Sequence, residues 1–83
     1  MPKKKLLGII INNPRNVAFR DFVALIEAFG FVHHRTNGSH RIYKHPKVAE
    51  NLNIQPRKDG TAKKYQIDQF LEYIETYSLQ TEG

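Results

Sequence analysis

Cysteine is absent from this sequence of 83 residues, and so is any long apolar run. Without cysteine, the chain cannot form disulfides, thiolate metal sites or redox-active thiols. The apolar run from Leu6 to Ile11 is too short to span a membrane, and Asn12-Asn13-Pro14-Arg15 after it lacks the small residues of a signal-peptide cleavage site. We therefore expect a cytoplasmic protein, and its length predicts one domain over residues 1–83.

Glycine is also sparse, with five residues scattered along the chain, so the sequence has no glycine-rich phosphate loop. Acidic residues are few, and the charge is uneven. All thirteen lysines and arginines lie within residues 1–64, which carry a net charge of +9, whereas residues 65–83 carry −4. This excess of positive charge favours a polyanionic partner without identifying one.

Turn-forming residues divide the chain into six short elements. The apolar spacing over residues 3–12 favours a short helix, although three successive isoleucines also suit a strand. From Ala18 to Phe29 apolar residues recur at helical spacing, and Gly30 is placed to end that helix in the left-handed conformation. A last amphipathic helix is expected around Ile67, running to about Tyr77.

Three strands are expected between these helices. Asn37-Gly38 separates two strand-like runs, Phe31–Thr36 and Ser39–Lys44, and Asn-Gly is typical of a type I′ hairpin turn. A loop over Pro46–Glu50 leads to a third strand, Asn51–Gln55. The predicted fold is α+β, with a three-stranded antiparallel sheet and helices packed on one face, in the order α-α-β-β-β-α.

The four histidines lie within thirteen residues, and this cluster is the least ordinary feature of the sequence; its members are His33, His34, His40 and His45. Three interpretations stay open. The histidines can be ordinary polar residues of an exposed sheet face. They can contribute to a zinc site, although adjacent strand residues point to opposite faces and few of the four could converge. One of them can act on RNA without a metal, taking the proton of a 2′-hydroxyl or protonating the leaving 5′-oxygen.

The expected hairpin turn predicts which side chains meet. A type I′ turn at Asn37-Gly38 pairs Thr36 with Ser39 and Arg35 with His40. Arg35 and His40 then share one face of the sheet, where the guanidinium offers a fork to a phosphate beside the imidazole. Lys44 on the same face and Ser39 at the turn are further candidates for phosphate contacts. Because Ser39 and His40 are adjacent, their side chains point apart on a strand, which excludes a hydrolase triad built on them.

A second basic group, which we call the basic run, lies in the last turn and at the start of the final helix; it comprises Arg57, Lys58, Lys63 and Lys64. Backbone N–H groups and the helix dipole favour an anion there, so these residues predict a grip on an RNA backbone, and a merely solubilising loop explains them equally well. Tyr43 and Tyr65 either stack on bases or belong to the core.

The stretch from Gly30 to Pro46 resembles the HicA toxin family, also called YcfA-like. The order Gly-Phe, then Gly-Ser-His, then an aromatic residue and His-Pro carries this resemblance, which covers about residues 18–78. It implies a double-stranded-RNA-binding-domain-like fold for this core. The helix expected at 3–12 is an extension before it, because the N-terminal segment to Pro14 is longer than in the simplest members of the family. The resemblance also implies an mRNA-cleaving endoribonuclease without a cofactor, with His40 as the catalytic residue and a HicB-type antitoxin as partner.

Two other classes of function stay open from the sequence. One is a non-catalytic RNA-binding module that uses the same basic hairpin surface. The other is an interaction protein that docks a partner through its sheet or an edge strand and whose histidines are incidental.

Overall fold

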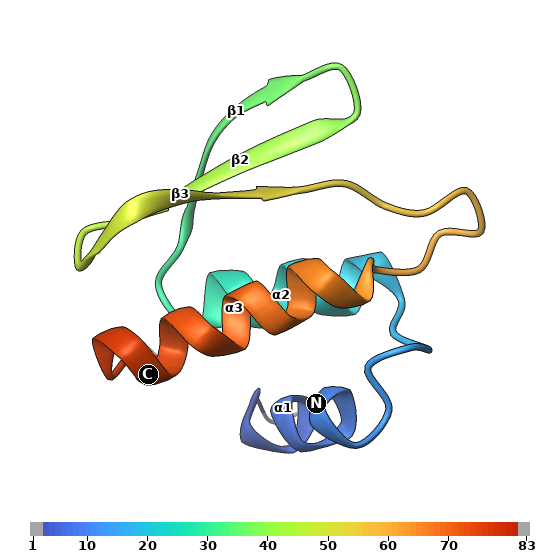
Figure 1. The fold of residues 1–83 in the computed structure, drawn as a ribbon, viewed down its shortest axis with the longest axis horizontal. Coiled ribbons are helices and arrows are strands. Elements are labelled where there is room, and N and C mark those ends of the chain that lie inside the picture. Colours follow the sequence, from blue (N-terminus) through green and yellow to red (C-terminus); the bar gives the residue numbers. More distant parts are fainter. Residues whose placement is uncertain (1–2, 82–83) are drawn as a thin grey trace.

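The computed structural model describes residues 3–81, so residues 1–2 and 82–83 of the predicted domain lie outside the described part. Three helices and three strands follow one another in the predicted order (Figure 1). In chain order they are α1 (Lys3–Asn12), α2 (Phe19–Ala28), β1 (Val32–Asn37), β2 (His40–His45), β3 (Val48–Ile54) and α3 (Lys64–Tyr77). The α+β class predicted from the sequence is confirmed, and the ambiguous first element is a helix.

The elements form three layers (Figure 1). The sheet is antiparallel with the strand order β1-β2-β3, and α2 and α3 cover one of its faces. Helix α1 lies on the far side of these two helices from the sheet. No described element covers the other face of the sheet, which we call the open face. Among residues 3–81, none of the helices has the length and apolar character that a membrane crossing requires.

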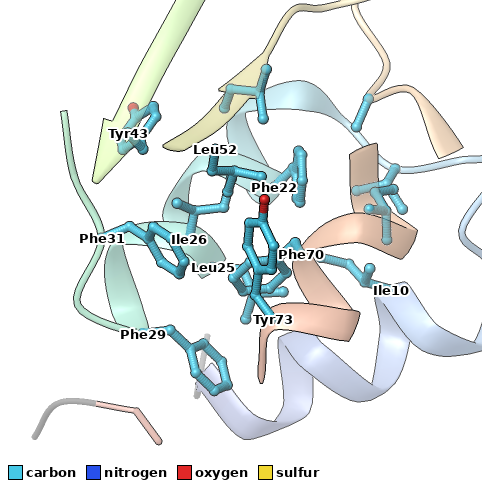
Figure 2. Close-up of a cluster of buried hydrophobic side chains, with 14 of the residues drawn as sticks. Ile10, Phe22, Leu25, Ile26, Phe29, Phe31, Tyr43, Leu52, Phe70 and Tyr73 are labelled. Atoms are coloured by element: carbon cyan, nitrogen blue, oxygen red, sulfur yellow. The ribbon is translucent and has the colours of Figure 1, made fainter. Parts of the chain in front are cut away.

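Aromatic side chains fill the core between the sheet and the helices (Figure 2). Phe70 of α3 is fully buried and meets three phenylalanine rings edge-on, with centroid distances of 5.8, 5.6 and 5.9 Å; these rings belong to Phe22, Phe29 and Phe31. Such pairs contribute about 0.5–1.5 kcal/mol each beyond the burial of their area. Tyr43 of β2 is buried in the same cluster and is therefore a core residue.

The hairpin turn between β1 and β2 lies one residue later than predicted. Asn37 pairs with His40, so the two loop residues are Gly38 and Ser39. Of these residues only Gly38 has a positive φ, of 63°, which a type II′ turn requires at its first central position. The predicted type I′ turn is wrong, because Gly-Ser satisfies a two-residue turn as well as Asn-Gly does.

Strand β3 begins three residues earlier than predicted. The chain reverses at Pro46 and Lys47, and His45 pairs directly with Val48. The expected loop over Pro46–Glu50 is therefore wrong. Val48 is buried in the core, and a register shift between Tyr43 and His45 accommodates the longer strand. Because the pairing is irregular here, a search for simple alternation of polar and apolar residues does not detect the first residues of β3.

Left-handed residues follow both long helices. Gly30 has φ 91° directly after the end of α2, which confirms its predicted role as the terminating residue. Helix α3 ends at Tyr77, as predicted, and its C-cap Ser78 has the same left-handed conformation, with φ 52°.

Candidate functional site

His40 is the first residue of β2, and its exposed side chain lies beside the hairpin turn. Its Nδ1 lies 3.2 Å from Oδ1 of Asn53 on β3. Because Asn53 pairs with Ile42, this hydrogen bond runs diagonally from one strand to the next. Tyr43 faces the helices, so His40 and Ile42 belong to the open face by the alternation of a strand. His40 is therefore anchored at one ring nitrogen on an accessible surface.

Arg35 also lies on the open face, but not directly opposite His40. It pairs with Ile42, while His40 pairs with Asn37. The predicted opposition of Arg35 and His40 is wrong, because the hairpin turn lies one residue later than Asn-Gly suggested. The two residues are diagonal neighbours, which long side chains can still bridge. The exposed side chains of Arg35 and His40 thus belong to the same face of the sheet.

Lys44 occupies the far end of this row on β2. It is exposed and, like His40, alternates with the core residue Tyr43, so it faces the same side of the sheet. It lies four positions beyond His40 on the strand, a distance of about 13 Å at ~3.3 Å per strand residue. Lys44 therefore lies on the same face as His40 but well away from it.

A bulge in β1 separates His33 from the open face. The register shifts between His33 and Arg35, and His33 pairs with Tyr43 on the helix side of the sheet. Its ring lies 5.3 Å from that of Tyr43, and its Nε2 is 2.9 Å from the hydroxyl oxygen of Thr36. The cluster of histidines is thus split between the two faces.

His45 is part of the scaffold. It is 9% exposed, its Nε2–H donates to the carbonyl oxygen of Phe29 at 3.0 Å, and its Nδ1 accepts from the backbone N–H of Lys47 at 3.0 Å. Its ring also meets Phe31 edge-on at 5.0 Å. Both ring nitrogens therefore tie the end of α2 to the turn between β2 and β3. Within residues 3–81, no three histidine, aspartate or glutamate side chains are grouped closely enough to hold a metal ion.

Gln55 connects the hairpin to the basic run. Its Nε2–H donates to the hydroxyl oxygen of Ser39 at 2.7 Å, and its Oε1 accepts from Nζ of Lys63 at 3.1 Å. Its backbone N–H donates to Oε1 of Gln66, which is only 2% exposed. Ser39 and Lys63, which the sequence suggested separately, therefore belong to one hydrogen-bonded network.

The basic run lies at the same end of the molecule as the hairpin turn. In Figure 1 the turn, the connection from β3 to α3 and the start of α3 all gather on the right-hand side. Arg57 and Lys58 are exposed in this connection. Lys64 forms an ion pair with Asp68, with Nζ 2.7 Å from Oδ2, so its charge is partly neutralised. The four cations are thus near one another but not equivalent.

Asp59 shapes the turn that carries Arg57 and Lys58. Its Oδ1 accepts from the hydroxyl of Thr61 at 2.6 Å and from the backbone N–H of Thr61 at 3.0 Å. These two bonds, with a smaller contribution from Arg57, hold the pKa of the Asp59 carboxyl below its usual range. The carboxylate therefore orders the turn from within and reduces its positive charge.

Tyr65 remains a surface residue, with 64% of its area exposed. Its hydroxyl oxygen accepts from Nε2 of Gln66 at 3.1 Å. The sequence predicted no site residue on β3 or directly after it, yet Asn53 contacts His40, and Gln55, the residue after β3, joins Ser39 to Lys63. The signal of Asn53 and Gln55 was present, since both alternate with the buried Leu52 and Ile54, but the register against β2 was needed to use it.

Comparison with protein families gives one match. Residues 19–75, which are more than half of the chain, match the family model described as the HicA toxin of bacterial toxin-antitoxin systems. Helix α1 precedes the matched region, which contains the sheet and the whole site around His40. Neither the curated proteins nor the solved structures gave a significant match.

Proposed function

The chain belongs to the HicA toxin family of bacterial toxin–antitoxin systems, and from this premise we propose that it is an endoribonuclease that cleaves mRNA with His40 as its catalytic residue. The family is one of toxins that generally act as mRNA-cleaving ribonucleases. The observation that supports the proposal most is the setting of His40, an exposed imidazole held at one nitrogen and accompanied on the open face by Arg35.

The proposed reaction is acid–base catalysis without a metal. The attacking group is the 2′-hydroxyl of the RNA itself, so the enzyme has to move protons and stabilise charge. His40 takes the proton of this hydroxyl or protonates the leaving 5′-oxygen. Arg35, a diagonal neighbour on the same face, offers its guanidinium to the phosphate, where negative charge builds up as the phosphorus becomes five-coordinate.

We propose that the RNA backbone follows the open face from Lys44 past His40 to the basic run. Lys44 and Arg35 bind phosphates on the sheet, and the hydroxyl of Ser39 donates to a phosphate at the turn. Beyond the turn the backbone meets the exposed cations Arg57 and Lys58. Lys63 and Lys64 extend this contact, because Gln55 already joins the hairpin to Lys63.

The proposed partner is a HicB-type antitoxin that inhibits the enzyme in the cytoplasm by covering the open face. No described element of the chain shields His40, so inhibition has to come from another molecule. An acidic antitoxin surface would compete with RNA for the cations on this face.

The test is RNA cleavage by purified protein carrying His40→Ala, together with growth arrest on its expression. Both activities should be lost, because the only proposed proton carrier is gone, while the exposed position leaves the fold intact. His34→Ala is the matched control, since His34 is another exposed histidine of the same hairpin. Cleavage retained by His40→Ala would overturn the proposal.

A non-catalytic RNA-binding module is the second candidate, and the network through Gln55 favours it, because this network joins the hairpin to Lys63 without any histidine. It predicts salt-sensitive RNA binding and no cleavage by the wild-type protein, even after long incubation. Binding that is equal in wild type and His40→Ala, with no cleavage by either, would favour this candidate.

A further inference from the structure

We propose that Asn53 is a positioning residue that fixes the tautomer of His40, so that His40 enters the reaction as a base through Nε2. The inference rests on the proposed ribonuclease activity and assigns a direction to the proton that His40 moves. It starts from the contact of 3.2 Å between Nδ1 of His40 and Oδ1 of Asn53.

The hydrogen bond determines where the imidazole carries its hydrogen. A neutral imidazole has one N–H and one nitrogen with a free lone pair, and an amide oxygen can only accept. Nδ1 of His40 therefore donates to Asn53, and the lone pair is on Nε2. Within residues 3–81 no hydrogen bond engages this Nε2. The nitrogen that is free to react is the one that accepts a proton.

His45 has the opposite arrangement in the same strand. Its Nδ1 accepts from the backbone N–H of Lys47, so its hydrogen is on Nε2, which donates to the carbonyl oxygen of Phe29. The protein thus selects each tautomer through the partner that it places beside the ring. For His40 that partner is a single side chain on a neighbouring strand, which makes the selection easy to remove by mutation.

Asn53 is well placed to hold this orientation. It lies between Leu52 and Ile54, both fully buried, so the backbone of β3 is fixed at this point. Across the sheet Arg35, Ile42 and Asn53 form one row, and His40 precedes Ile42 by two residues on β2. Arg35 and Asn53 are therefore diagonal neighbours of His40 on either side. The imidazole is bound toward Asn53, and the side toward Arg35 is left for a phosphate.

The resulting step is a transesterification. Nε2 takes the proton of the 2′-hydroxyl while the 2′-oxygen bonds to phosphorus and the bond between phosphorus and the 5′-oxygen breaks. The leaving 5′-oxygen takes a proton from water, and the imidazolium returns its proton to the hydroxide so formed. The products are a 2′,3′-cyclic phosphate and a 5′-hydroxyl end, with no other reactant consumed.

The first test reads the tautomer without any activity. In histidine ¹⁵N-labelled full-length protein at alkaline pH, long-range ¹H–¹⁵N spectra should show a protonated Nδ1 and an unprotonated Nε2 for His40. Asn53→Ala should shift this ring toward the Nε2–H tautomer, whereas His45 should not change. Wild-type His40 with its hydrogen on Nε2, or a spectrum unaffected by Asn53→Ala, would overturn the inference even if His40 is essential for cleavage.

The second test is kinetic and uses three variants. Asn53→Ala should lower kcat by about 10- to 100-fold with little change in KM, because a misoriented base slows the chemical step and leaves RNA binding unchanged. Asn53→Asp keeps the acceptor and should restore most of kcat, while its carboxylate favours the imidazolium and moves the pH–rate profile to higher pH. Asn51→Ala, at another exposed position of β3, is the control and should behave as wild type.

Two kinetic outcomes would contradict the inference. One is an unchanged kcat in Asn53→Ala. The other is an Asn53→Asp variant whose pH–rate profile coincides with that of wild type, because a residue with a merely structural role would not move that profile. If His40→Ala retains cleavage, the proposed function itself fails, and the tautomer spectra still decide separately whether Asn53 orients the ring.

Discussion

The two ends of β2 use the same side chain in opposite ways. His40, at the start of the strand, is exposed and gives only Nδ1 to the protein. His45, at the end, is buried and gives both ring nitrogens to backbone groups. The fold thus leaves one ring nitrogen of His40 free, as the proposed proton transfer requires, and uses both ring nitrogens of His45 as a structural link. The histidines of the Gly-Ser-His and His-Pro motifs therefore have different environments, although they belong to the same strand.

The two ends of the molecule also differ in charge. The end of the molecule with the hairpin turn carries the basic run, and the opposite end holds the C-terminal part of α3 (Figure 1). Glu72 and Glu75 are exposed on α3. Glu50 accepts a hydrogen bond of 2.7 Å from Tyr77, which raises the pKa of that tyrosine. The exposed glutamates of α3 thus lie at the opposite end from the basic run, an arrangement that would draw an approaching polyanion toward the hairpin turn.

The largest expected effect is a difference in stability between the protein with His45 replaced and the protein with His40 replaced. His45→Ala should lower the free energy of unfolding by about 2–4 kcal/mol, because it leaves the carbonyl of Phe29 and the N–H of Lys47 without a partner and removes the edge-on contact with Phe31. His40→Ala should change it by less than about 0.5 kcal/mol, as is usual for an exposed residue. Urea unfolding followed by circular dichroism measures both. Equal losses in the two variants would break the comparison.

The next effect tests the turn that places His40. Gly38 has φ 63° with open space around the position of a Cβ, so Gly38→Ala should cost about 1 kcal/mol of unfolding free energy through backbone strain alone. Asn37→Ala is the matched control and should be nearly neutral, because a type II′ turn does not require a positive φ there. A type I′ turn would instead make both substitutions costly. Thermal unfolding of the two variants therefore distinguishes the two turns.

The sequence was sufficient for the elements whose signal is local. The apolar spacing of α2 and α3 follows from burial on one side of a helix, and Gly30 ends α2 because a left-handed residue is easiest for glycine. The order of the elements and the α+β class follow from these patterns. The choice of His40 came from the family resemblance and from its place at the hairpin.

The sequence was insufficient where two local solutions compete. Asn37-Gly38 and Gly38-Ser39 each suit a two-residue turn, and the choice moves every cross-strand pair, including the partner of Arg35. The contacts of Asn53 and Gln55 depend on how β3 aligns with β2, which the burial of Leu52 and Ile54 determines across the whole domain. Such contacts are set by tertiary packing, and the alternation of residues along β3 does not reveal which partners they have.

The smallest expected effect compares charged residues of the two ends by the salt dependence of RNA binding. Lys58 is exposed in the basic run, so Lys58→Ala should weaken RNA binding a few-fold and make the slope of log affinity against log salt less negative by about 1. Lys64→Ala should change the slope less, since Asp68 already neutralises part of that charge. Glu72→Gln, at the acidic end, should leave the slope unchanged. Fluorescence anisotropy at several salt concentrations measures all three, and an unchanged slope in Lys58→Ala would remove the basic run from the proposed RNA path.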